Sequence, residues 1–180
     1  MSTQINFIPI NIAIITISDT RVLDNDKSGD VLEKKVLKSN HKIISREIVK
    51  DNFDKIYQLF QNLINNKKID VIISTGGTGL TGRDITPEVM KTLFDKTIDG
   101  FGEMFRWLSY SKIGTSALQS RALAGVSNGT YIFCLPGSPS ACRDGWDQIL
   151  IHQLDIRHKP CNFVEIMLRL QEHKLARKKN

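Results

Sequence analysis

Residues 11–18 (NIAIITIS) are a near-continuous run of β-branched side chains, a pattern typical of a strand that is buried on both faces. A strand of this kind needs helices or other elements on both sides of its sheet. Polar residues end the run, and residues 28–39 then carry apolar side chains at helical spacing. The chain therefore begins with a strand, a loop and a helix, and this order returns further along.

The alternation continues with predicted strands at residues 43–49, 70–75 and 130–135 and predicted helices at residues 53–64 and 140–154. Another helix is expected to begin near residue 86. Residues 100–108 are expected to be partly helical, and residues 118–126 to be a helix end that leads into a short strand. Alternating strands and helices predict an α/β fold, a three-layer, doubly wound, mainly parallel sheet with helices on both faces.

The length of 180 residues, with 41% hydrophobic composition, supports one globular core and is too short for two full domains. The apolar stretches are far too short to span a bilayer, and the first residues do not resemble a secretory signal. We therefore expect a cytoplasmic protein without a membrane partner. Its cysteines, Cys134, Cys142 and Cys161, lack the spacing of a disulfide framework or zinc site.

The formal net charge of +6 is compatible with nucleic acid, with an acidic small substrate or simply with a basic surface. Part of the excess lies close to the C-terminus, in residues 173–179. Aromatic residues make up 7% of the chain and stand mostly in core-like positions, so a nucleic-acid partner is not expected. The four histidines lack metal-ligand spacing and are expected at the surface.

Residues 74–88 (STGGTGLTGRDITPE) are the most informative segment, because glycines let backbone amides approach an anion closely. A phosphate is the ligand that such a loop would be expected to bind. The alternative is that the segment is only a tight turn that requires glycine. The segment is not a Walker A loop. A formal GxGxxG at residues 77–82 fits a dinucleotide site poorly, because Arg83-Asp84 separate it from the start of the next helix. In that helix Thr86 is expected as N-cap and Pro87 at the first helical position.

Carboxylates accompany these glycines at the predicted edge of the sheet. Asp84 lies in the glycine-rich loop, where a divalent metal would have to separate it from a phosphate; pairing with Arg83 is the alternative. Asp51 follows the second strand and could reach the same rim, or cap a helix. Ser18-Asp19 and Pro136-Gly137-Ser138 also follow strands, and each could contact a ligand or form a turn.

Together these segments resemble the MoaB/MogA family of molybdenum-cofactor biosynthesis proteins. The motifs that carry the resemblance are Ser18-Asp19, residues 74–88, Gly100-Phe101-Gly102-Glu103, Ser120-Arg121 and Leu135-Pro136-Gly137. Gly114-Thr115-Ser116 and Asn162-Phe163 are closer to the MoaB branch. The resemblance places one molybdopterin-binding domain at residues 8–165, followed by a basic C-terminal tail at residues 166–180.

The resemblance implies a mixed, mainly parallel sheet, a homotrimer or homohexamer, contact with other enzymes of the pathway, and transfer of AMP from Mg²⁺-bound ATP to molybdopterin with release of pyrophosphate. It assigns catalysis and magnesium binding to Asp51 and Asp84. Family members of the MogA type usually have Pro-Asp-Glu where this chain has Lys50-Asp51-Asn52. The residues expected to bind substrate or nucleotide are Ser18, Asp19, Thr75, Gly76, Gly77, Thr78, Gly79, Arg83, Thr86, Pro87, Glu88, Pro136, Gly137 and Ser138.

A non-catalytic molybdopterin-binding protein of the same fold remains the alternative function. Phe101, Phe105, Trp107 and Leu108 are interpreted as an exposed apolar surface that would form the oligomer contact.

Overall fold

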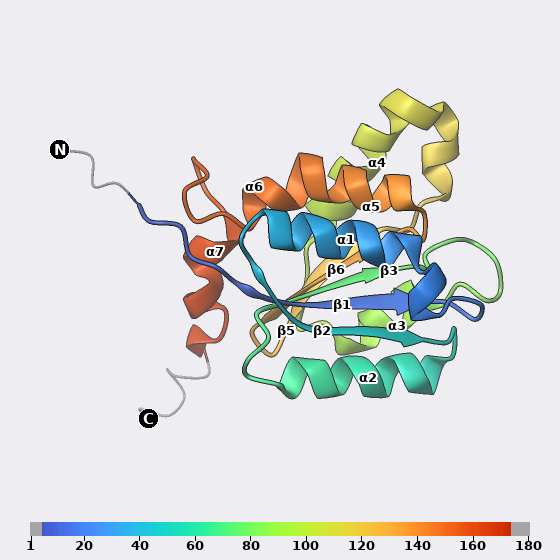
Figure 1. Ribbon diagram of the computed structural model, residues 1–180, viewed down its shortest axis with the longest axis horizontal. Coiled ribbons are helices and arrows are strands. Elements are labelled where there is room, and N and C mark those ends of the chain that lie inside the picture. The colour runs from blue at the N-terminus through green and yellow to red at the C-terminus, as the bar shows by residue number, and fades with distance from the viewer. Residues whose placement is uncertain (1–4, 174–180) are drawn as a thin grey trace.

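The computed structural model describes residues 5–173, and in this part of the chain six strands form one sheet (Figure 1). The strands are β1 (Asn11–Ile17), β2 (Lys42–Val49), β3 (Val71–Thr75), β4 (Lys96–Thr97), β5 (Leu123–Ser127) and β6 (Thr130–Leu135). Their order is β2-β1-β3-β6-β5-β4. The first four strands in this order are parallel, whereas β5 and β4 are antiparallel to their neighbours.

Helices cover both faces of the sheet, as the sequence predicted. They are α1 (Lys27–Lys38), α2 (Phe53–Asn65), α3 (Thr86–Leu93), α4 (Asp99–Ile113), α5 (Pro139–Gly145), α6 (Ile151–Gln153) and α7 (Phe163–Ile166). A π-helical turn, η3 (Trp146–Leu150), joins α5 to α6, and the short 3-10 turns are η1 (Leu23–Asn25), η2 (Gly114–Gln119) and η4 (Met167–Arg169). In Figure 1, α2 and α3 lie below the sheet and α1, α4 and α5 above it.

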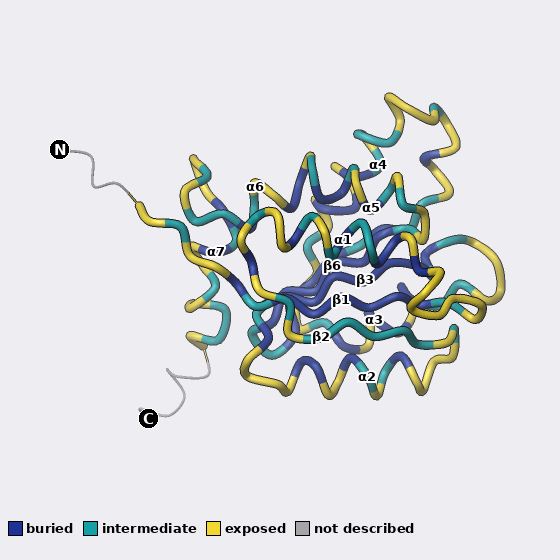
Figure 2. The backbone as a smooth tube through the Cα atoms, viewed as in Figure 1, coloured by how far each residue is buried: buried dark blue, intermediate teal, exposed yellow. Residues whose placement is uncertain are grey.

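The core divides into two apolar layers because successive side chains of a strand point to opposite faces. Ile12 and Ile14 pack with the layer under α1, α4 and α5, whereas Ala13 and Ile15 pack with α2 and α3. Both sets are buried, so the β1 pattern is that of a central strand covered on two sides (Figure 2). The prediction of a mainly parallel α/β sheet with helices on both faces is confirmed.

The region between α3 and β6 differs from the sequence prediction. The helix α4 extends from Asp99 to Ile113, well beyond the expected residues 100–108, and β5 pairs with β6 as a hairpin. The two residues of its turn, Asn128 and Gly129, have φ values of 47° and 85°. Asn-Gly is the preferred pair for such a turn, so the sequence did carry the signal of this hairpin.

Three side chains that the sequence placed at the surface, those of Phe101, Phe105 and His41, are buried. Phe101 and Phe105 are each 3% exposed and belong to the core, which corrects their interpretation as an exposed surface. His41, expected at the surface, is also buried, and its Nδ1 accepts a hydrogen bond from the backbone N–H of Ile10 at 3.3 Å. Helical periodicity identifies an apolar face without identifying what covers it.

The segment predicted as a basic tail begins with structured backbone. Met167 and Leu170 pack against the core layer above the sheet, and Gln171 donates a hydrogen bond to the backbone carbonyl of Asn128. Residues 174–180, which carry most of the basic side chains of this tail, lie outside the described residues. Among residues 5–173, no helix has both the length and the apolar character needed to cross a membrane.

Candidate functional site

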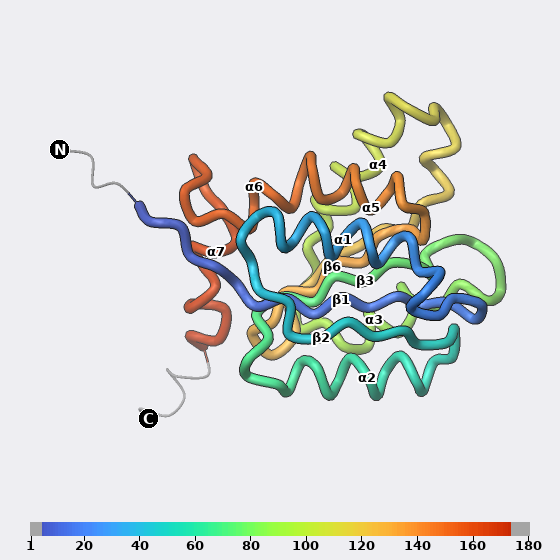
Figure 3. Tube along the Cα trace, in the orientation of Figure 1, coloured from blue at the N-terminus to red at the C-terminus, as the bar shows by residue number. Residues whose placement is uncertain are grey.

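The loops that follow β1, β2, β3 and β6 meet at the carboxyl end of the parallel strands. Figure 3 shows the loops after β1, β2 and β3 on the same side of the molecule, and α7 at the opposite end. These loops line a cavity of about 750 Å³, which is closed on another side by α4 and η2. The place agrees with the general rule for open α/β sheets, in which ligands bind beyond the carboxyl ends of the strands.

Most of the predicted site residues line this cavity. They are Ser18, Asp51, Thr75, Gly76, Gly77, Thr78, Gly79, Asp84, Pro136, Gly137 and Ser138. The predicted residues that do not line it are Asp19, Arg83, Thr86, Pro87 and Glu88.

The start of the glycine-rich loop has a backbone that other residues would not adopt easily. Gly76 and Gly77 have φ values of +105° and +63°, in the left-handed region that favours glycine. A Cβ on Gly76 would collide with the backbone carbonyl oxygen of Ile17. The loop therefore lies directly against the end of β1, with no room for a side chain.

Thr86 fixes the other side of this turn instead of capping α3. Its hydroxyl donates to the carbonyl oxygen of Gly76 at 3.0 Å, and its backbone N–H donates to that of Gly77 at 3.0 Å. The N-cap residue of α3 is Ile85, so the prediction of Thr86 as N-cap was wrong. Pro87 is therefore the second residue of α3, one position later than predicted, and still lies in the first turn. Thr86 thus holds the glycine turn in place from behind.

Asp84 is held firmly inside the loop. Its Oδ2 accepts hydrogen bonds from the backbone N–H of Thr81 at 3.0 Å and from the Thr81 hydroxyl at 2.6 Å. Partial burial works to raise the pKa of this carboxyl, but the Thr81 and Gly79 hydrogen bonds and the charge of Arg121 outweigh it, and the pKa lies below its ordinary value. Asp84 is therefore a fixed anion at neutral pH.

Asp51 has the opposite surroundings. Its Oδ1 is buried and has no hydrogen-bond partner among the described residues. Burial raises the pKa of Asp51 above its ordinary value, and repulsion from Asp19 and Asp84 raises it further, while Arg83 lowers it in part. Burying a carboxylate oxygen without a partner costs free energy, and a cation bound by this oxygen would offset that cost.

The glycines of the loop leave space for both acids. A Cβ on Gly77 would lie 2.9 Å from Asp51 Oδ1, and a Cβ on Gly79 would lie 2.7 Å from Asp84 Oδ2. Within residues 5–173, no group of three or more histidine, cysteine or acidic side chains is arranged to hold a metal. The two carboxylates nevertheless fit magnesium, which is commonly held by one or two carboxylates together with substrate phosphates and water.

The remaining strand-end residues mainly shape the rim. Ser18 Oγ accepts from the backbone N–H groups of Thr20 and Arg21, both at 3.3 Å, so it forms the turn after β1. Arg83 and Asp19, which are next to Asp84 and Ser18 in the sequence and do not line the cavity, form an exposed ion pair. Their pairing joins the glycine-rich loop to the loop after β1.

The loop after β6 is an ordered strand-to-helix junction. Ser138 caps α5 by accepting the backbone N–H of Ala141 at 3.2 Å, and the carbonyl of Gly137 accepts the Ser28 hydroxyl at 2.8 Å. The helix N-terminus that lines the cavity is therefore already capped by its own serine.

One wall of the cavity was not predicted from the sequence. Its residues come mainly from α4, η2 and α5, and are Phe105, Ser109, Lys112, Ile113, Gln119, Ser120, Ser140, Ala141 and Asp144. Other lining residues that were not predicted lie in or near β1 and α1, and are Thr16, Ile17, Thr20, Arg21, Asp26 and Ser28. Lys112 and Asp144 pair at 2.5 Å across the junction of α4 and α5. Predicting this wall would have required the full length of α4.

The fold and the cavity define an α/β protein with a glycine-rich loop and two carboxylates at the carboxyl edge of its sheet. A family model described as "Probable molybdopterin binding domain" matches residues 13–156. The chain is 47% identical over 157 residues to molybdenum cofactor biosynthesis protein B of Escherichia coli K12, covering 87% of this chain and 92% of the relative. This chain belongs to the MoaB/MogA family of molybdenum-cofactor biosynthesis proteins.

Two further comparisons agree. A protein of Methanocaldococcus jannaschii named "Probable molybdopterin adenylyltransferase" is 40% identical over 141 residues, covering 74% of this chain and 83% of the relative. A crystal structure of a molybdenum cofactor biosynthesis protein B superposes with a TM-score of 0.82 at 38% identity, covering 91% of this chain and 97% of that one. The resemblance seen in the motifs is thus confirmed over most of the chain.

Proposed function

We propose that the protein is a molybdopterin adenylyltransferase, which transfers AMP from ATP to the terminal phosphate of molybdopterin in the presence of magnesium. The observation that carries the proposal is the pair of acids beside the glycine loop. Asp84 is a fixed carboxylate, and Asp51 has a buried oxygen with no hydrogen-bond partner among residues 5–173. The name of the Methanocaldococcus relative supports the same reaction.

The chain can perform this transfer by positioning and charge alone. Magnesium held by Asp51 and Asp84 would supply neutralisation of the triphosphate. The loop at residues 76–79 lines the cavity with glycines that let phosphate oxygens come close to backbone amides. An oxygen of the pterin phosphate forms a bond to the α-phosphorus of ATP, and the bond from that phosphorus to the bridging oxygen breaks, so pyrophosphate leaves.

No general base is required for this step. The nucleophile is a phosphate oxygen, which is already ionised near neutral pH. The residues expected to bind substrate therefore serve to hold two anionic ligands in line. In this proposal Ser18, Thr75, Thr78 and Ser138 contact the ligands together with the glycines. Asp19, Arg83, Thr86, Pro87 and Glu88, which do not line the cavity, shape its rim and support the loop.

A non-catalytic molybdopterin-binding protein is the second candidate. It is favoured by the small number of acids at the site, since no cluster of three metal-binding side chains exists within the described range, residues 5–173. Incubating the purified protein with molybdopterin, ATP and magnesium, and following adenylylated molybdopterin and pyrophosphate, separates the two. Both products are expected. Binding of molybdopterin without either product would support the second candidate instead.

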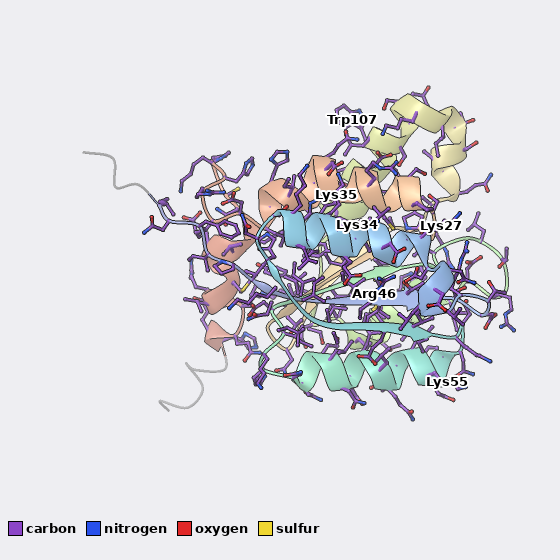
Figure 4. The ribbon with its side chains drawn as sticks, in the orientation of Figure 1. Lys27, Lys34, Lys35, Arg46, Lys55 and Trp107 are labelled. Atoms are coloured by element: carbon purple, nitrogen blue, oxygen red, sulfur yellow. The ribbon has the colours of Figure 1, made fainter. Side chains whose placement is uncertain are left out.

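We also propose that the protein is a homo-oligomer, a trimer or a hexamer. The apolar surface differs in part from the one expected, because Phe101 and Phe105 are buried. The exposed large hydrophobic side chains of α4 and η2 are Met104, Trp107, Tyr110, Ile113 and Leu118. Trp107 is 74% exposed and projects away from α4 in Figure 4. An apolar surface of this kind marks an interaction site, and light scattering should give a mass above that of a monomer.

A further inference from the structure

Arg121 makes an unusual set of contacts for a side chain that does not line the cavity. It stands between η2 and β5, more than thirty positions after the glycine-rich loop in the sequence. Its Nε donates to the carbonyl oxygen of Gly79 at 2.7 Å, and its Nη2 donates to that of Asp84 at 2.6 Å. Its Nη1 pairs with the carboxylate of Glu88. One guanidinium therefore contacts both ends of the loop at residues 79–84 and the first turn of α3.

The backbone of Arg121 adds a fourth contact, because its N–H donates to the carbonyl oxygen of Thr78 at 3.1 Å. Arg106 supports the same place from α4, donating to the carbonyl oxygens on either side of Arg121, those of Ser120 at 3.4 Å and Ala122 at 3.3 Å. The loop that carries Asp84 is thus fastened to the α4 side of the molecule.

We propose that Arg121 is a positioning residue for the magnesium-nucleotide site. It holds the loop at residues 79–84 closed, so that the carboxylate of Asp84 is presented on the same cavity wall as Asp51. This inference rests on the proposed function for its ligand, a magnesium-bound nucleoside triphosphate. In this proposal Arg121 acts through the loop and not on the ligand, because it does not line the cavity and each of its three side-chain nitrogens bonds to the loop or to Glu88.

The geometry explains why this position needs arginine. Each of the three acceptors bonds to a different nitrogen of Arg121, and a planar guanidinium presents several donors in a rigid arrangement. Lysine carries the same charge on one rotatable ammonium group and cannot hold all three acceptors with that geometry. Replacing Arg121 by lysine should therefore keep the local charge but release one or both ends of the loop.

The experiment measures the affinity of ATP with and without magnesium by calorimetry. In Arg121→Lys the magnesium-dependent affinity should fall about tenfold, the scale expected when charge-assisted hydrogen bonds are lost. The affinity without magnesium should hardly change. Amide hydrogen exchange in residues 79–84 should become faster, whereas exchange in β1 should not. Arg157→Lys is the matched control, because Arg157 forms an exposed pair with Asp155 away from the cavity.

A double-mutant cycle distinguishes positioning from a general structural role. If Arg121 acts through Asp84, then Arg121→Lys combined with Asp84→Asn should bind Mg²⁺-ATP no more weakly than Asp84→Asn alone. Additive losses, or unchanged affinity and exchange in Arg121→Lys, would overturn the proposal. Glu88→Gln loosens the outer contact of Arg121 and serves as a second, milder variant if the lysine variant melts at a much lower temperature.

The results also separate this inference from the proposed function. Wild-type protein that binds ATP with magnesium dependence but forms no adenylylated product would remove the adenylyltransferase and leave the role of Arg121 intact. If wild-type protein forms the adenylylated product and Arg121→Lys binds Mg²⁺-ATP as wild type does, the adenylyltransferase proposal stands and the positioning role of Arg121 is wrong. If the ATP affinity of wild-type protein does not depend on magnesium, both proposals are wrong.

Discussion

The loops after β2 and β3 each bring one carboxylate to the same cavity, but the two carboxylates differ in their hydrogen bonding and in the direction of their pKa shifts. The loop after β3 surrounds Asp84 with donors, and the pKa of this carboxyl lies below its ordinary value because those hydrogen bonds and Arg121 outweigh its partial burial. The loop after β2 leaves Asp51 Oδ1 buried and without a partner, and burial with repulsion from Asp19 and Asp84 raises the pKa of Asp51.

The difference shows how one cavity can combine a carboxylate that is already fixed in position with one that still lacks a partner. A carboxylate that is already satisfied is fixed in place and stabilises its loop. A carboxylate that lacks partners destabilises the ligand-free protein, and this cost is recovered when a cation binds. In the proposed reaction Asp84 is therefore the rigid half of the magnesium site and Asp51 the half that gains most from the ion.

The largest effect should come from removing either negative charge. Asp84→Asn and Asp51→Asn keep the side-chain size but remove a magnesium ligand, and each should lower turnover by about a hundredfold or more. Molybdopterin affinity should change little, because backbone amides of the loop hold its phosphate. Steady-state rates and pterin binding, measured on the same preparations, check both statements. Full activity in both variants would show that the metal-binding acids have been placed wrongly.

A medium effect should distinguish the two glycines that face these acids. Gly77 has a positive φ, and a Cβ there would collide with Thr86 Oγ1 and approach Asp51. Gly77→Ala should therefore lower the free energy of unfolding by about 1–3 kcal/mol. The three atoms nearest to a Cβ on Gly79 all belong to the Asp84 carboxylate, the closest at 2.7 Å, and Gly79 has no positive φ. Gly79→Ala should cost less stability but still weaken magnesium-dependent ATP binding, because it displaces Asp84.

Gly82 offers a matched control in the same loop. A Cβ on Gly82 meets nothing within 4 Å, and Gly82 lacks a positive φ. Gly82→Ala should leave stability within about 0.5 kcal/mol of wild type, as for most surface substitutions. Equal melting temperatures for the Gly77 and Gly82 variants would show that the turn at Gly77 tolerates a side chain and that its fixed shape has been overstated.

The sequence predicted the parts of this site that depend on local signals. Buried strands, the glycine-rich loop and the convergence of strand ends follow from patterns a few residues long, which is why Asp51, Asp84 and residues 75–79 were found together. Arg121 and the α4 wall were not assigned to the site, because their roles depend on contacts between segments far apart in the chain. The missing partner of Asp51 Oδ1 is a property of packing, and no sequence pattern reports it.

The smallest effect concerns the ligand-free protein and tests the comparison most directly. Because the pKa of Asp51 is raised in the folded state, its ionised form destabilises the protein at pH 7. Asp51→Asn removes this charge and should raise the melting temperature of ligand-free protein by about 1–3 °C, a modest gain because Asp51 is only half-buried.

The gain should depend on pH with a defined sign. As the pH falls through the raised pKa of folded Asp51 towards its ordinary value, wild-type Asp51 becomes protonated and neutral, so the advantage of asparagine should shrink and disappear. Asp54→Asn should behave differently, because Asp54 is an exposed acid in the first turn of α2, where the helix dipole favours a carboxylate. That control should lose a little stability at pH 7. Calorimetric melts of wild type, Asp51→Asn and Asp54→Asn between pH 4 and pH 7 would test this comparison. If Asp51→Asn were less stable than wild type at pH 7, Asp51 would already have a stabilising partner. The two loops would then not differ as proposed.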